Sequence, residues 1–92
     1  MLFRSSIFSN ADLSDADFQA SRFTGAAFVR SNLQRTNLSY ADLRLADFTD
    51  ADLRGANFTK TIWWGARFRG AVVDSSTKLP RSEEHTSELQ SH

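Results

Sequence analysis

Eight aspartates are the acid–base candidates of residues 1–80, a stretch that contains no Cys, His or Glu. Ser/His/Asp and Cys/His catalysis and the usual zinc ligand sets each need one of the missing residue types. Calcium binding by rows of aspartate would need a G-G-x-G-x-D pattern, and the sequence has neither that pattern nor a glycine-rich phosphate loop. We therefore predict a non-enzymatic protein with no catalytic residue, no metal site and no cofactor.

Most of these aspartates belong to a repeat of five residues. In ADLRLADFTDADLRGANF, residues 41–58, a small residue, an Asp or Asn and a large apolar residue follow one another in every unit. The small position is Ala, Ser or Thr from Ser6 to Ala71, and all four glycines stand two residues after a large one. We expect a turn with positive φ at the glycine position, because glycine adopts it at least cost. Asp or Asn fills the middle position at Asp12, Asp17, Asn32, Asn37, Asp42, Asp47, Asp52 and Asn57.

A period of five fits neither an α-helix nor a long strand, and it indicates a solenoid in which each unit turns a corner. Large residues at a separation of 20 are alike, whereas a separation of 15 mixes Phe and Leu, so we predict four units per coil. Coils about 4.8 Å apart would stack like on like, with Phe rings offset-stacked down the axis. The expected core ladder is Phe8, Phe28, Phe48, Phe68, Leu13, Leu33 and Leu53.

Charged residues test the same period independently of the apolar ones. A separation of 20 stacks five opposite pairs and no like pair, while a separation of 15 stacks Arg54 on Arg69. Each exposed pair is worth at most about 1 kcal/mol, so we expect the pairs to select the register more than to stabilise it. The predicted pairs are Arg22 with Asp42, Arg30 with Asp50, Arg35 with Asp15, Arg67 with Asp47, and Arg54 with Asp74.

The A(D/N)LxxADF pattern, kept in register from Ser6 to Val73, resembles the pentapeptide-repeat family. The resemblance implies an all-β fold, a right-handed quadrilateral parallel β-helix with the large and small residues inside. Residues 1–76 would then form just under four coils. The family resemblance also implies that some members mimic duplex DNA, dimerise end to end and protect type II topoisomerases such as DNA gyrase. No stretch of this sequence matches a dedicated functional motif, so no active residue is carried over.

The function that we expect is a protein–protein interaction scaffold whose protein partner is unknown. A DNA-mimicking modulator of a type II topoisomerase (DNA gyrase) is the alternative, but a mimic should be acidic, and residues 1–80 hold ten Lys and Arg against eight Asp. Interleaved charges also lack the continuous basic stripe of a nucleic-acid binder, so we expect no direct nucleic-acid contact. The chain could also be the repeat region of a larger effector or enzyme. We expect no membrane span and a cytoplasmic location.

The sequence breaks its own pattern in KTIWWGARFRGAVV. Apolar residues take the Asp/Asn position at Ile62 and Val72, and Trp64 takes an outward position that is otherwise polar. With Leu45, about one coil below, they form a candidate partner or homodimer surface at the C-terminal end, with Trp64 as anchor above Arg44. The alternative is capping, in which a further segment covers the open core and unpaired edge of the last coil.

Composition changes at Pro80, because every Glu and both His residues follow it. The segment RSEEHTSELQSH, residues 81–92, resembles the translation of a sequencing adapter read through in frame. The alternative is a genuine polar tail, which the composition also permits. We therefore predict a repeat domain over residues 1–76 and a disordered tail over residues 77–92, with residues 81–92 an artefact.

Overall fold

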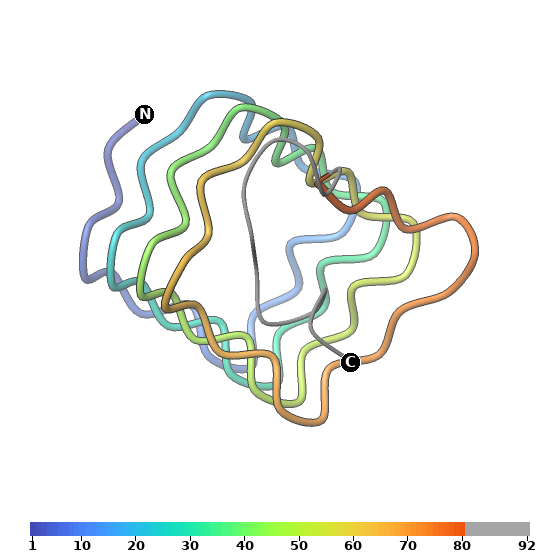
Figure 1. The fold of residues 1–92 in the computed structure, drawn as a ribbon. Helices are drawn as coiled ribbons and strands as arrows, with labels where there is room; N and C mark the ends of the chain where they lie inside the picture. The colour runs from blue at the N-terminus through green and yellow to red at the C-terminus, as the bar shows by residue number, and fades with distance from the viewer. Residues whose placement is uncertain (81–92) are drawn as a thin grey trace.

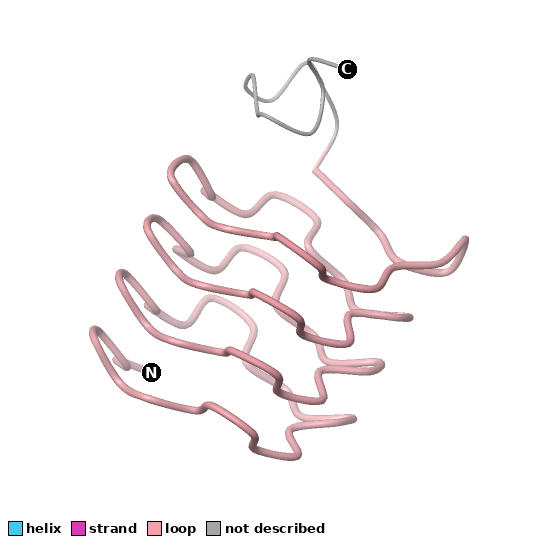
Figure 2. Ribbon diagram, turned by 90° about the horizontal axis from the view of Figure 1, so that it is seen from below, coloured by secondary structure: helices cyan, strands magenta, loops and turns pink. Residues whose placement is uncertain are grey.

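The backbone winds through successive coils that stack on one another, seen along the stack in Figure 1 and from the side in Figure 2. The computed structural model describes residues 1–80. Parallel bridges join residues twenty apart, from Leu2↔Arg22 to Asp52↔Val72. Within the described residues the bridges are isolated, with no helix and no longer strand, because a turn follows every bridged residue. The predicted separation of 20 is therefore the observed one.

Every unit closes with the same tight turn. The N–H of the small residue donates to the C=O of the large residue three positions earlier, as from Ala46 to Leu43 (3.1 Å) and from Ala51 to Phe48 (3.0 Å). The residue two positions after the large one has positive φ in every unit from Ser5 to Gly70. A positive φ at this third position of the turn is typical of a type II turn. Ten of these residues are not glycine, so most units hold an L-residue in a conformation that glycine adopts more easily.

The inside of the stack is filled by columns of like side chains. In one column each Phe ring stacks on the ring twenty residues away, with centroids 5.2, 4.9 and 5.1 Å apart and planes within 10°. The middle members of the ladder are fully buried, and the end members are partly buried against them. The fully buried members are Phe28, Phe48, Leu33 and Leu53, and the partly buried ones are Phe8, Phe68 and Leu13.

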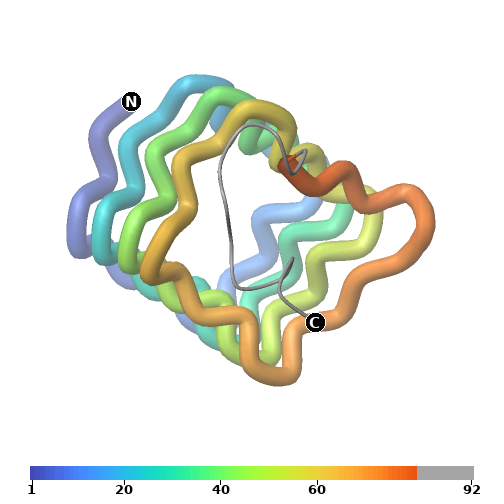
Figure 3. The backbone as a smooth tube through the Cα atoms, viewed as in Figure 1, coloured from blue at the N-terminus to red at the C-terminus, as the bar shows by residue number. Residues whose placement is uncertain are grey.

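The fourth coil departs from the period by one residue. The last bridge joins Asn57 to Lys78, a separation of 21, and the turn before it is closed by the N–H of Thr77 donating to the C=O of Asp74 (3.1 Å). This segment, orange in Figure 3, projects beyond the coils beneath it. Backbone pairing thus extends past residue 76, where the sequence placed the end of the repeat. The segment interpreted as an adapter translation, residues 81–92, lies outside the described residues.

Candidate interaction surface

The Asp/Asn row is part of the turn architecture. In each unit the side-chain Oδ1 accepts a hydrogen bond from the backbone N–H two residues later, as Asn32 does from Gln34 (3.0 Å) and Asn57 from Thr59 (3.0 Å). Such Asx turns fix the backbone before each corner. Hydrogen bonds from Ser14 hold the pKa of Asp12 below its ordinary value for this reason. The same contact is made by Asp12, Asp17, Asn32, Asn37, Asp42, Asp47, Asp52 and Asn57.

Six of the eight acidic side chains of residues 1–80 are therefore engaged with their own turns and spread along the columns. Within residues 1–80 no three acidic, His or Cys residues come together in a group that could hold a metal ion. In the same described stretch, no helix has the length and the apolar character that crossing a membrane requires.

Charged residues form fewer cross-coil ion pairs than the register allows. Among residues 1–80, Arg35 pairs with Asp15 one coil away (Nε–Oδ1 2.7 Å), as predicted. Arg54 pairs with Asp52 in its own unit (2.7 Å) instead of with Asp74, whose Oδ1 accepts hydrogen bonds from Ser76 of its own turn. The other three predicted pairs have the right register but no ion pair within the described residues. Arg30, one of them, donates from Nε to Asn10 Oδ1 (3.1 Å).

Trp64 stands on the outside of the fourth coil, directly above Arg44 of the third. The Arg44 guanidinium carbon lies 5.7 Å from the centre of the Trp64 ring, a cation–π distance. The carboxylate of Asp42 accepts two hydrogen bonds from the guanidinium, from Nε (2.8 Å) and Nη2 (2.6 Å). These bonds lower the pKa of Asp42 and raise the pKa of Arg44. Trp64 itself is 53% exposed, so one side of its ring is supported and the other is available.

Two aliphatic side chains flank Trp64. Ile62 is bridged to Asp42 and points outward two residues before Trp64, so both lie on the same side of the extended segment. Leu45 follows Arg44 with a φ of 64° and lies below Gly65, where an added Cβ would come within 2.7 Å of Leu45 Cδ2. All three are about half exposed. We call the set Arg44, Leu45, Ile62 and Trp64 the Trp64 corner.

Val72 is not part of the Trp64 corner. It is bridged to Asp52, whereas Ile62 is bridged to Asp42, so the two lie two units apart in a coil of four units. Two corners of the coil separate them, which places Val72 on the far side of the stack. The surface predicted from sequence thus divides into the Trp64 corner and a separate, half-exposed Val72.

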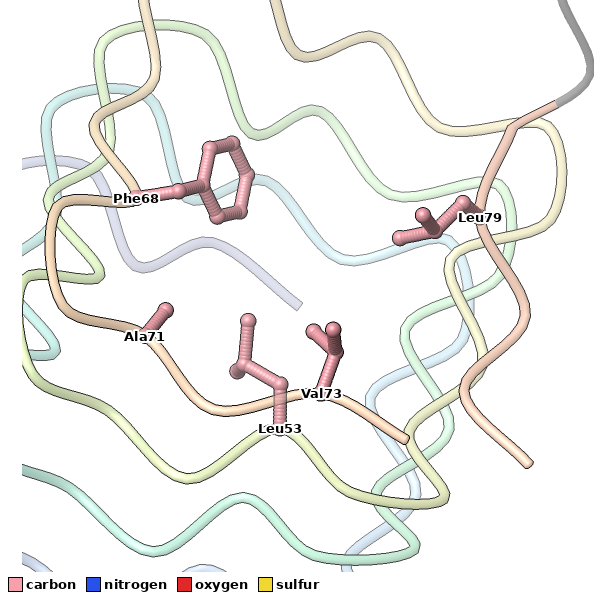
Figure 4. A pocket seen from close by; sticks show the side chains of 5 residues that line it. All are labelled: Leu53, Phe68, Ala71, Val73 and Leu79. Carbon is pink, nitrogen blue, oxygen red and sulfur yellow. The ribbon is translucent and has the colours of Figure 1, made fainter. Parts of the chain in front are cut away.

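A second apolar feature opens at the C-terminal end of the stack, a hollow of about 240 Å³. It is lined by Leu53, Phe68, Ala71, Val73 and Leu79, whose side chains converge on it in Figure 4. Leu79 did not enter the predicted core because the extra residue before Thr77 shifts it out of the five-residue register. The signal was present in the sequence: Thr77, Lys78 and Leu79 repeat the small, polar, large order one residue late.

Comparison with known proteins identifies the family to which the repeat belongs. A family model described as "Pentapeptide repeat region" matches residues 1–77, and the chain belongs to this family. The crystal structure of Rfr23, a pentapeptide repeat protein from the cyanobacterium Cyanothece 51142, is similar with a TM-score of 0.80 and 31% identity. That match covers 82% of this chain and 51% of Rfr23, so the chain spans about half the length of that protein.

Two further solved structures are similar. The pentapeptide repeat protein alr5209 from Nostoc Pcc 7120 has a TM-score of 0.51 and 32% identity over 88% of this chain and 75% of its own. QnrB1, a plasmid-mediated fluoroquinolone resistance protein, has a TM-score of 0.63 and 18% identity over 80% of this chain and 38% of its own, a likeness of fold alone. No curated protein sequence matches the chain.

Proposed function

We propose that this protein is a non-enzymatic interaction module that binds a partner protein through the Trp64 corner. The observation that carries the proposal is the half-exposed Trp64 ring held over Arg44 and flanked by Leu45 and Ile62. Trp and Arg are the residue types most enriched among interface residues that dominate binding energy. In the two lowest coils the position of Trp64 is held by Arg4 and Thr24, so the aromatic side chain is an exception on its own column.

The support beneath Trp64 favours binding over mere exposure. Asp42 fixes the Arg44 guanidinium with two hydrogen bonds, so the charged plane under the ring is already ordered. A preorganised surface loses less conformational entropy when a partner docks, and that lower cost appears directly as affinity. A partner with an apolar side chain for the open face of Trp64 and an acceptor for the guanidinium edge fits this arrangement.

Capping explains the Trp64 corner less well. A segment covering the end of the stack would pair with the edge of the fourth coil and fill the hollow there. Leu45 belongs to the third coil, whose backbone is already paired, since its own N–H donates to the C=O of Trp64 (3.2 Å). The exposed Leu45 side chain therefore needs another reason, and a lateral partner supplies one.

The shape of the coils, the cellular location and the alternative functions are also matters of proposal. We propose that the coils form a right-handed quadrilateral β-helix, supported by the separation of 20 with four turns in each coil. We also propose a cytoplasmic location. The topoisomerase alternative and the larger effector or enzyme remain predictions. Inhibition of gyrase supercoiling by the purified chain would favour the first of them over a scaffold.

The experiment compares Trp64→Ala with Tyr40→Ala, which removes another exposed aromatic ring from a different column. Proteins captured from cell extract by the full chain are purified and titrated back against both variants by calorimetry. We expect a partner whose Kd rises at least about tenfold with Trp64→Ala and is unchanged with Tyr40→Ala. Direct binders that respond to neither change, or equally to both, would refute the role of the Trp64 corner.

A further inference from the structure

We infer that the two ends of the coil stack are complementary, so that a second copy of this chain seats its first coil on the fourth coil of its neighbour. The first argument is the backbone. Inside the stack, Phe48 N–H donates up to Arg67 C=O (2.7 Å) while Arg67 N–H donates down to Ala46 C=O (2.9 Å). Each coil thus presents the same arrangement of backbone N–H donors and C=O acceptors on its upper edge, and the complementary arrangement on its lower edge.

At the top of the stack this pattern has no partner within residues 1–80. The N–H groups of Phe68 and Val73, which correspond to Phe48 and Leu53 one coil below, donate to nothing there, and the C=O of Ala71 accepts nothing. At the bottom, the C=O of Ile7 and of Asp12 likewise accept nothing. A first coil placed in the same register would let Phe68 donate to Ile7 and Val73 to Asp12 of the next copy. Pairing of open strand edges in this way is a general route to association.

The side chains of the two ends match in the same register. Phe8 of the next copy would stack on Phe68 and continue the ring column. Within the chain, neighbouring rings of this column are about 5 Å apart. Leu13 shares its column with Leu53, so it would enter the hollow lined by Leu53 and Val73.

Charge selects the head-to-tail arrangement over contact between two like ends. The side chains of residues 1–20 include one Arg and three Asp, whereas those of residues 61–80 include three cations and one Asp. Two fourth coils facing each other would bring excess positive charge together, while a first coil on a fourth coil pairs opposite excesses. Asp17 and Lys78, the ends of one column, would meet directly. A contact between unlike surfaces does not close on itself, so it builds an open-ended rod of copies.

The test is sedimentation of the full 92-residue chain from micromolar to near-millimolar concentration. We expect a growing series of species with no stop at the dimer. Val73→Lys places a charge in the hollow that Leu13 must fill and should weaken association at least about a hundredfold. Val72→Lys is the matched control: it is 48% exposed against 51% for Val73, lies next to it, and faces outward towards the column of Asp12 and Asp52. Its association should not be weakened, because the new ammonium group would face the carboxylate of Asp12 of the next copy, and equal circular dichroism spectra show that both variants fold.

A charge exchange identifies which ends meet. Lys78→Asp and Asp17→Lys should each weaken association about tenfold at low salt, and the double variant should recover it. An interface between two C-terminal ends would stop at the dimer, and Asp17→Lys would neither disturb nor rescue it. Either that result, a chain that stays monomeric throughout, or equal effects of Val72→Lys and Val73→Lys would overturn the inference.

Discussion

Two columns with the same period of 20 show how differently the inside and the outside of this molecule constrain sequence. The inner column is Phe at all four levels, whereas the outer column reads Arg4, Thr24, Arg44 and Trp64. Inside, each ring rests on the next at about 5 Å, so a change at one level leaves a gap or a clash at two others. Outside, water fills any mismatch. The inner columns therefore specify the fold, and the outer ones are free to differ where a partner binds.

The largest effect is expected where the inner column is changed at its centre. Phe48→Ala should lower the free energy of unfolding by about 3 to 5 kcal/mol, because Phe48 is fully buried between two stacked rings. Urea denaturation followed by circular dichroism measures the change. Phe8→Ala is the comparison within the same column: Phe8 is partly buried in the first coil and stacks on one side, so its loss should cost clearly less. Equal costs would show that the loss of unfolding free energy does not depend on how deeply each ring of the column is buried.

A turn glycine beside the Trp64 corner gives the next largest effect. Gly65 has a φ of +75°, and an added Cβ would lie 2.7 Å from Leu45 Cδ2. Gly65→Ala should cost roughly 1 to 2 kcal/mol, mostly from forcing an L-residue into the left-handed region, since the end of the Leu45 side chain can move aside. In a Leu45→Ala background the cost of Gly65→Ala should decrease only by the part that comes from contact with the Leu45 side chain. A double-mutant cycle on unfolding free energies measures this, and a cost that vanishes entirely would show that contact, not backbone conformation, requires glycine.

The inner columns could be predicted from sequence because they repeat. The period of 20 and the positive φ at the glycine position followed from residue types and spacing, and the structure has both. The reason for the Asp/Asn row did not follow, because an Asx turn depends on side-chain conformation, not on spacing. Leu79 was missed for a related cause: one inserted residue moves it out of the register on which the prediction rested.

The outer surface could be predicted only where a residue is unusual for its position. Trp64 and Ile62 break the pattern, and the structure does bring them beside Arg44 and Leu45. Val72 breaks the pattern as well but lies on the far side, because a period of 20 separates residues ten apart by half a coil. Ion pairs were predicted least well. Long Arg side chains choose between a carboxylate in their own unit and one in the next coil, and sequence alone does not rank the two.

A substitution of Ile62, on the outer surface, should change stability and partner binding in opposite directions. Ile62→Asn restores the side-chain acceptor that the other units use, so it should raise the free energy of unfolding by about 0.5 to 1 kcal/mol through a new bond from the Trp64 N–H. The same change removes an apolar side chain from the Trp64 corner and should lower the affinity for the partner protein. Thermal unfolding and calorimetric titration measure the two effects. Ile62→Ala is the control, since it lacks the acceptor; if it stabilises as much as Ile62→Asn, the Asx turn is not the cause.

The smallest effect is expected from the ion pair beneath Trp64. Hydrogen bonds from Arg44 lower the pKa of Asp42, so the folded chain releases this proton more readily than the unfolded one. The resulting stability is present above the unfolded pKa of about 3.9 and is lost as the pH falls through the lower, folded value.

Urea midpoints should therefore stay level from pH 7 to pH 5 and decrease below about pH 4, with Asp42 contributing less than about 1 kcal/mol. Asp42→Asn keeps the side-chain oxygen that accepts the Arg44 N–H but removes the charge, so its decrease should be shallower than that of the unchanged chain. Parallel decreases would place the acid sensitivity on other carboxylates, such as Asp15 and Asp52, whose pKa values are also lowered by hydrogen bonds from Arg side chains. The ion pair between Asp42 and Arg44 would then contribute little to the stability of the folded chain.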